Sequence, residues 1–203
     1  MPSNTKLHQP IQSTNVDSGI AELIDLLNNS PVKDNEFVYP DDITDYTGAL
    51  PSLAYVSEPD RIPKYPGMVI TLVGQILSAI GQTPFNPAHR GAVGFWLTDG
   101  GQILAGALYN AYSDQRITIA DAARLLAGSD LTLAGMKSQI NYCVAQGQLT
   151  CVPCPRWTKT QWSTYAAERR GSAERIPYQL LRGEIDALNV QLNEKRKKRK
   201  VTK

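Results

Sequence analysis

The sequence predicts a mainly α-helical fold, with one compact helical domain that has few short strands, then a C-terminal helix and a basic tail. Three observations predict it. Apolar residues recur at helical spacing in several segments, glycines and prolines separate these segments, and basic residues collect at the C-terminal end. A chain of 203 residues is long enough to bury a core.

The first third of the chain predicts an arm, one helix and a long loop. Residues 1–16 are polar and predict a flexible arm. Asp17 or Ser18 can cap a helix that runs to about Asn29, because short polar side chains bind the free N–H groups of a first turn. Residues 30–66 are rich in Pro, Asp and Tyr without a clear period, which predicts a wrapping segment with short strands or turns at most.

The middle of the chain is almost uncharged. Across residues 65–113 the only Lys, Arg, Asp or Glu residues are Arg90 and Asp99. Met68–Ile80 is apolar around most of a helical circumference, so we expect a helix buried on nearly all sides. Two more weakly charged segments should be helical, with Asp99 as a cap: 92–97 and 101–112. This block supplies a core and offers a subunit interface.

Two helices are expected next. Thr118 is placed to cap a helix over Ile119–Leu126. After a turn at Gly128 and Ser129, a second helix should run over 133–146 and end at Gly147 in the left-handed conformation.

The last part of the chain predicts a short strand over 149–152 and two more helices. One is capped by Thr158 or Thr160 and runs through Arg170, and the other opens at Pro177. The last helix has an apolar seam spaced four, three and four residues apart: Leu181, Ile185, Leu188 and Leu192. The predicted organisation is an arm (1–16), a helical domain (17–172), a C-terminal helix (173–194) and a basic tail (195–203).

Residues 117–171 resemble a known DNA-binding architecture. Ile117–Leu126, the following Gly128-Ser129 turn, Gly147-Gln148-Leu149, Trp157–Thr160 and Glu168-Arg169-Arg170 occur in the order of the MerR-like and excisionase-like winged helix-turn-helix families. The resemblance implies that the second helix enters the major groove and that the loop after it contacts the DNA backbone. The alternative is an ordinary helical hairpin whose apolar residues are core.

The resemblance nominates particular contact residues. Base edges would be read by Lys137, Ser138, Gln139 and Asn141, because amide and basic side chains can bind base edges through two hydrogen bonds. Phosphates would be contacted by Arg156 and Lys159, with support from Arg169 and Arg170.

The charge of the chain is split by position. Residues 1–155 hold 8 Lys+Arg and 14 Asp+Glu, a net −6, whereas residues 156–203 hold 13 and 5, a net +8. Six consecutive basic residues lie almost at the C-terminus: Lys195, Arg196, Lys197, Lys198, Arg199 and Lys200. Such a cluster indicates a polyanionic partner, usually nucleic acid; a solvated tail and a nuclear-localisation run are the other interpretations.

Enzymatic, metal-binding and membrane functions are not expected. The chain has two histidines, no G-x-G-x-x-G motif and no phosphate-binding loop. Cys151 and Cys154 have the spacing of half a zinc site, yet only Cys143 and His89 could complete it, so free thiols are expected, with no metal and no cofactor. No segment is long and apolar enough for a membrane span or secretory signal, which predicts a cytoplasmic or virion-internal protein that is not secreted.

Two functions follow from these observations. The first is a non-enzymatic, nucleic-acid-binding homo-oligomer, a winged-helix-like DNA-binding factor of phage or mobile-element type. The alternative is a viral coat or nucleocapsid protein that polymerises through residues 65–113 and packages its genome with residues 195–200. Both leave open whether the partner is DNA or RNA.

Overall fold

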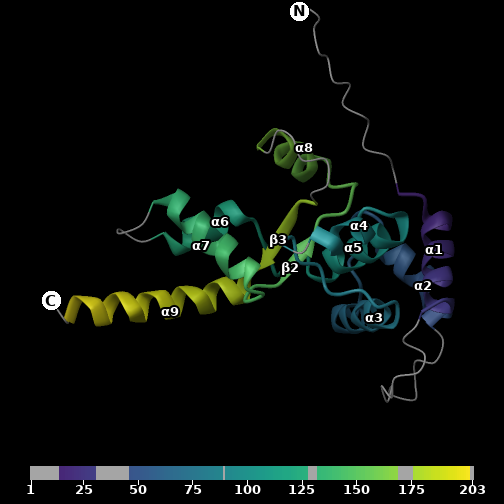
Figure 1. Ribbon diagram of the computed structural model, residues 1–203, viewed down its shortest axis with the longest axis horizontal. Coiled ribbons are helices and arrows are strands. Elements are labelled where there is room, and N and C mark those ends of the chain that lie inside the picture. Colours follow the sequence, from purple (N-terminus) through teal and green to yellow (C-terminus); the bar gives the residue numbers. More distant parts are fainter. Residues whose placement is uncertain (1–13, 31–45, 89, 128–131, 169–175, 202–203) are drawn as a thin grey trace, which may run out of the picture.

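The computed structural model describes a molecule with a helical lobe at one end and a long C-terminal helix at the other (Figure 1). The described residues are 14–30, 46–88, 90–127, 132–168 and 176–201. These residues form nine helices and three short strands, so the mainly α-helical fold is confirmed. The predicted arm, apart from residues 14–16, lies outside them, as do Gly128, Ser129 and residues 202–203.

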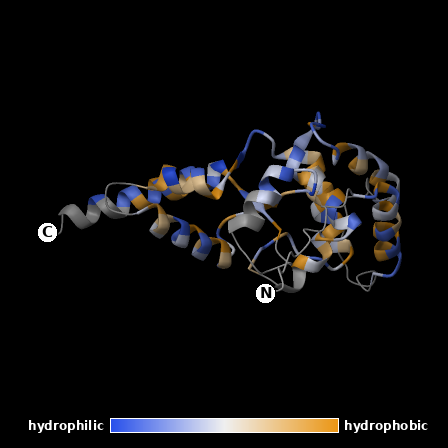
Figure 2. Cartoon of the chain, turned by 90° about the horizontal axis from the view of Figure 1, so that it is seen from above, coloured by the Kyte–Doolittle hydropathy of each residue, from blue (hydrophilic) through white to orange (hydrophobic). Residues whose placement is uncertain are grey.

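The helical lobe is built around one buried helix. This helix, α5 (Asp99–Ala111), has eleven of its thirteen residues buried. Four helices pack around it: α1 (Val16–Asn28), α2 (Tyr46–Val56), α3 (Pro66–Ala79) and α4 (Arg90–Trp96). In Figure 2 these helices carry both hydrophobic and hydrophilic residues, as amphipathic helices around a shared core do. Much of the uncharged middle of the sequence therefore forms the core of its own domain.

A small antiparallel sheet lies between this lobe and the C-terminal helix. Its strands are β1 (Arg116–Ile117), β2 (Cys151–Pro153) and β3 (Tyr178–Leu181), in the spatial order β1-β3-β2. Leu180 of β3 is opposite Ile117 on one side and Cys151 on the other. Strands β1 and β2 thus both pair with β3, which follows them in the chain.

The remaining helices are connected through this sheet. Between β1 and β2 the chain forms α6 (Ile119–Leu126) and α7 (Leu133–Ala145), which pack on each other. Between β2 and β3 it forms α8 (Lys159–Glu168). After β3, α9 (Arg182–Val201) packs on α6 and continues beyond it.

The predictions for α6 and α7 are confirmed. The side chain of Thr118 accepts a hydrogen bond from the N–H of Asp121, which caps α6 at the expected residue. Gly147 has φ +67° directly after the end of α7, the left-handed conformation that a glycine adopts most readily.

Two predicted caps are wrong by one to three residues. Asn15 caps α1 by accepting from the N–H of Ser18, so Asp17 and Ser18 lie inside the helix. Thr98 caps α5 by accepting from the N–H of Gly101, and Asp99 is the first residue of the helix. In each case another short polar side chain before the expected one reaches the free N–H groups first.

The prediction for residues 30–66 is wrong for residues 46–56, whereas residues 57–65 form turns and irregular backbone as expected. Residues 46–56 form α2 although Pro51 lies inside it, because Leu50, Leu53 and Ala54 are buried against the core. The burial of these side chains outweighs the helix-breaking tendency of a proline in the first turns. Residues 31–45 lie outside the described part of the chain.

The predicted environment of the third helix is also wrong. The helix was expected to be buried on nearly all sides, yet Met68 is exposed, as are the small residues Thr71 and Ser78 on the same helix. Only the face that holds Val73, Ile76 and Leu77 packs against α5 and the core.

The predicted C-terminal boundaries are wrong as well. Residues 178–181 form the middle strand of the sheet, so the domain does not stop at 172 and the last helix does not open at Pro177. Helix α9 runs to Val201, so the basic run continues the helix and is not a separate tail. Within α9, Ile185, Leu188 and Leu192 pack against the core of their own domain.

Candidate nucleic-acid interface

Helix α7 presents a polar face to the solvent. Its buried stripe consists of Met136, Ile140, Cys143 and Val144, which are three or four residues apart and so share one side of the helix. The rest of its circumference is largely exposed. Lys137, Ser138 and Asn141 are exposed, as the DNA-binding interpretation requires.

The structure does not bring all the nominated residues of α7 to one face. Lys137 and Asn141 lie about 40° apart around the helix, whereas Gln139 is about 160° from Asn141. The side-chain amide of Gln139 lies 3.7 Å from the sulfur of Cys143. Tyr142 is exposed beside Asn141 and was missed, although its spacing of four from Ser138 places both on the same face.

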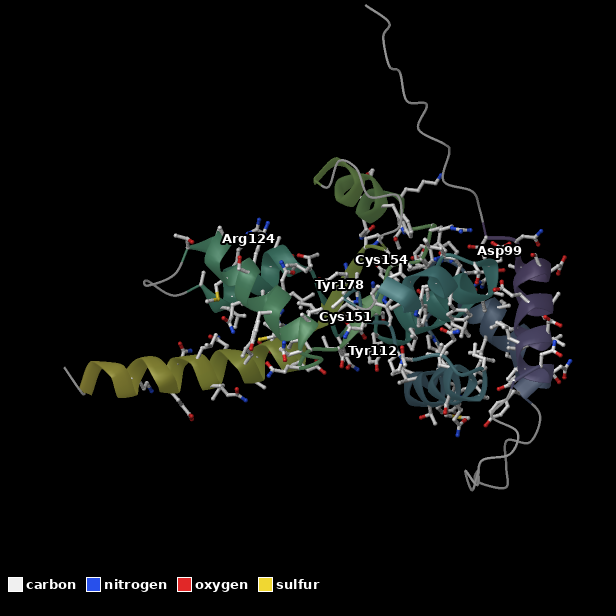
Figure 3. The ribbon with its side chains drawn as sticks, viewed as in Figure 1. Asp99, Tyr112, Arg124, Cys151, Cys154 and Tyr178 are labelled. Atoms are coloured by element: carbon white, nitrogen blue, oxygen red, sulfur yellow. The ribbon has the colours of Figure 1, made fainter. Side chains whose placement is uncertain are left out.

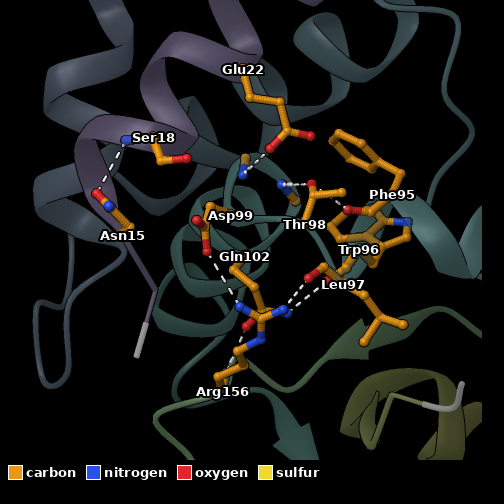
Figure 4. Close-up of polar contacts among 12 residues, drawn as sticks. Asn15, Ser18, Glu22, Phe95, Trp96, Leu97, Thr98, Asp99, Gln102 and Arg156 are labelled. Carbon is orange, nitrogen blue, oxygen red and sulfur yellow. Dashed lines mark hydrogen bonds and ion pairs between the residues drawn. The ribbon is translucent and has the colours of Figure 1, made fainter. Parts of the chain in front are cut away.

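Arg156 is paired inside the molecule (Figure 4). Its Nη1 lies 3.3 Å from Oδ1 of Asp99, its Nη2 donates to the carbonyl of Leu97, and its backbone N–H donates to Oε1 of Gln102 at 2.7 Å. The side chains of Arg156 and Asp99 are 21% and 25% exposed. Arg156 therefore attaches the segment after β2 to the start of α5, and its charge is already compensated.

The segment that leads into α8 is anchored to the helical lobe. The indole N–H of Trp157 donates to the carbonyl of Ser57 at 2.9 Å, a contact between residues one hundred positions apart. The indole N–H of Trp162 donates to the carbonyl of Pro155 at 2.9 Å. Lys159, the first residue of α8, is exposed and free of these contacts. Arg169 and Arg170 lie outside the described residues.

The basic run forms the last part of α9. Its backbone is helical and the side chain of Lys197 is exposed. Figure 1 shows this end of α9 at the same end of the molecule as the α6–α7 pair. Positive charge is thus concentrated near the helices that the resemblance assigns to DNA reading.

Three further arginines surround a cavity of about 490 Å³ beside the start of α6, and sequence reasoning missed two of them, Arg116 and Arg124. The guanidinium of Arg116 lies 3.3 Å from the centroid of the Tyr109 ring and donates to Oε1 of Gln179 at 3.0 Å. Arg124 pairs with Asp121, and Arg182 with Asp186. Each belongs to an element next to the sheet, and no pattern in the linear sequence joins them.

The cysteines are buried free thiols. Cys151 and Cys154 lie where β2 joins the two halves of the molecule (Figure 3), and Cys143 is buried in α7. Burial raises the pKa of Cys151 and of Cys154 to about 12, so both thiols are protonated at neutral pH. Within the described ranges no three His, Cys, Asp or Glu side chains come together as a metal site, and His89 lies outside those ranges.

Of the helices that the structure describes, none combines the length and apolarity needed to cross a membrane. In comparisons with known proteins, no family model, curated protein or solved structure matches the chain.

Proposed function

We propose that the protein is a non-enzymatic, nucleic-acid-binding homo-oligomer, a winged-helix-like DNA-binding factor of phage or mobile-element type that acts in the cytoplasm or inside a virion. The order of elements around the sheet supports this most strongly. A strand, two packed helices, a second strand, helix α8 and a third strand follow one another, and the third strand lies between the other two. Apart from α8, this is the order of a winged helix-turn-helix domain, with α7 in the place of the reading helix.

The chemistry of α7 is compatible with base reading. Lys137 and Asn141 share its exposed face, and a basic and an amide side chain can read guanine and adenine edges in the major groove. Exposed Tyr142 adds an aromatic surface with a hydroxyl group beside them. Gln139 and Arg156 are left out of the proposed interface, because the first lies on another side of α7 and the second is paired with Asp99.

The end of α9 would supply most of the affinity. Phosphate contacts dominate the binding of proteins to nucleic acid, and Lys137 is the one Lys or Arg in the sequence of α7. Residues 195–200 add six cations at the same end of the molecule. We infer that α9 binds phosphates without sequence preference while α7 reads bases.

Replacement of Lys195–Lys200 by alanine tests the affinity. We expect weaker binding to a random-sequence duplex and a clearly shallower dependence on salt, because each lost phosphate contact removes about 0.9 from the slope of log K against log salt. Fluorescence anisotropy across a salt series measures both. A slope equal to that of the wild type would remove α9 from the mechanism.

Asn141→Ala tests base reading, with Gln139→Ala as the control on another side of the same helix. After selection of preferred duplexes from a random pool, Asn141→Ala should lose the preference of the wild type and Gln139→Ala should keep it. Loss of a two-hydrogen-bond contact costs about 1–3 kcal/mol of discrimination. If the two variants behave alike, α7 is not the reading helix.

The coat or nucleocapsid alternative has less support. It requires the uncharged middle of the chain at the surface, whereas most of α5 is buried within its own lobe. Only the region around α2 and α3 leaves large apolar side chains of this middle exposed. A large particle that carries nucleic acid after purification would restore the alternative.

A further inference from the structure

An apolar groove of about 1250 Å³ lies between α2, α3 and the segment that joins them. Its lining includes Leu53, Val56, Val69 and Leu72. Eight large hydrophobic side chains are exposed in the described part of the chain, and four of them line this groove: Tyr55, Ile62, Tyr65 and Met68. Exposed apolar side chains that gather in one place mark an interaction surface, whereas scattered ones do not.

The segment that carries these side chains is held in place. The side-chain amide of Asn110 donates to the carbonyls of Val56 and Glu58, both at 2.7 Å. The carbonyl of Ser57 accepts from the indole of Trp157. Nη1 of Arg61 donates to the hydroxyl of Tyr55 at 2.8 Å, so the rim is tied to α2. A surface that is already ordered loses little conformational entropy when it binds.

The rim of the groove has charges of both signs. Asp60 is acidic and Arg61 and Lys64 are basic, and Arg61 is neutralised by Glu58, which lies 3.5 Å from it just outside the lining. Asp60 and Lys64 form no ion pair with another described residue. A strand of nucleic acid would require an excess of positive charge, whereas this rim is balanced. Opposite charges around an apolar centre are complementary to the same surface turned through 180°.

We propose that the occupant of this groove is a second copy of the chain, which docks through the same surface in a two-fold symmetric dimer. The four exposed apolar side chains meet across the axis, and Asp60 of one copy faces Lys64 of the other. The seam of α9 is not free for this role, because Ile185, Leu188 and Leu192 pack within their own domain. The dimer would carry two copies of α7, one in each protomer.

This proposal deepens the homo-oligomer part of the proposed function and can fail separately from nucleic-acid binding. The test is sedimentation equilibrium of the full chain, freed of nucleic acid at high salt. The wild type should dimerise, and Ile62→Glu and Met68→Glu should each raise the dissociation constant at least about a hundredfold, because a carboxylate would be buried in an apolar interface. Ile62 and Met68 are 64% and 69% exposed, so the monomer tolerates the change.

The matched control is Val190→Glu on α9, where the side chain is 60% exposed. It should leave the dissociation constant unchanged. Thermal unfolding followed by circular dichroism verifies that all three variants are folded. A monomeric wild type would overturn the proposal and assign the groove to another segment of this chain or to a different protein. A dimer that Val190→Glu disrupts while Ile62→Glu does not would overturn it in favour of α9.

The charge pair across the axis has its own test. Asp60 has φ +62°, a conformation that asparagine also tolerates, so Asp60→Asn neutralises it without new backbone strain. Asp60→Asn and Lys64→Gln should each weaken dimerisation several-fold. The dissociation constant of the double variant should be no higher than that of either single variant, because the two groups pair with each other. Additive losses would overturn the arrangement in which these charges meet.

Discussion

Arg156 is a cation whose charge the molecule itself compensates. Its guanidinium lies between the carboxylate of Asp99 and the carbonyl of Leu97, while its backbone N–H binds Gln102. A basic residue in a segment of the right spacing looks like a phosphate ligand in the sequence. Its position next to α5 gives it a structural role instead, which links β2 to the helical lobe.

Arg156→Ala should therefore lower stability and leave nucleic-acid binding largely intact. The change leaves the carboxylate of Asp99 and the carbonyl of Leu97 without their partner, and we expect a loss of about 1–2 kcal/mol, since both side chains keep some contact with water. Urea unfolding measures this loss. Lys159→Ala, a change at an exposed cation nearby, should be neutral for stability. If Arg156→Ala is as stable as the wild type and its nucleic-acid binding depends less on salt, Arg156 is a phosphate contact after all.

The thiols of Cys151 and Cys154 should resist modification in the folded protein. Burial holds their pKa at about 12, against 9.0 for an ordinary thiol, so neither forms the reactive thiolate near pH 8. An aromatic disulfide reagent should label them only after unfolding. Rapid labelling of the native protein at either position would contradict the buried placement.

The same shifts predict a loss of stability in alkali. The unfolded chain releases these protons near pH 9, whereas the folded protein keeps them until about pH 12. The stabilising contribution is therefore complete below pH 9 and falls as the pH rises from 9 to 12. Urea unfolding at pH 8 and pH 10.5 measures the fall, and Cys154→Ala should make it smaller. If Cys154→Ala loses as much stability between pH 8 and pH 10.5 as the wild type does, the loss comes from titrating groups other than this thiol.

At the scale of elements, the packing of α5 explains why glycines are numerous in it. A Cβ atom at Gly106 would lie 2.4 Å from the carbonyl oxygen of Ser57, the same oxygen that Trp157 binds. The missing side chain lets α5 approach the end of α2 closely. The contact joins α2, α5 and the segment before α8 at one point.

Gly106→Ala should destabilise the protein by about 1–3 kcal/mol, because the added methyl group overpacks this contact. Gly74→Ala on α3 is the matched control, since its Cβ would meet nothing within 4 Å. Alanine is the better helix former, so this control should be neutral or more stable by up to about 1 kcal/mol. Urea unfolding measures the stability of both variants. Equal stabilities would contradict the close approach of α5 to Ser57.

At the scale of the whole molecule, charge and structure divide α9 into two parts. Ile185, Leu188 and Leu192 hold its first half on the domain, whereas residues 195–201 continue the helix outward from the rest of the molecule (Figure 1). Residues 195–203 contain 7 Lys+Arg and no Asp+Glu, so a chain that ends at Glu194 changes from a formal +2 to −5. The outer half thus determines the sign of the net charge of the chain.

A truncation after Glu194 should keep its stability within about 0.5 kcal/mol and lose retention on heparin, a sulfated polyanion. Circular dichroism and salt elution measure the two effects. A truncation after Gly183 removes the three packed apolar residues as well and should unfold at markedly lower urea concentration. Retention of the first truncated protein on heparin would place the polyanion site elsewhere.

Helices α6 and α7 were predictable from the sequence, because their caps and apolar spacing are local properties of neighbouring residues. Thr118 caps α6 and Gly147 follows α7 where the pattern predicts them. The exposure of Lys137 and Asn141 follows from the same period. The net basic character of the last quarter of the chain is likewise a property of the sequence alone.

Where conformation or pairing depends on residues that are distant in the sequence, the sequence did not predict it. Residues 178–181 form a strand because β1 and β2, far apart in the sequence, accept and donate their hydrogen bonds on both sides. Residues 46–56 form a helix because the core buries one of their faces despite Pro51. The pairing of Arg156 and the apolar groove beside α3 arise in the same way, since spatial neighbours contributed by other elements determine whether a side chain is paired, buried or exposed.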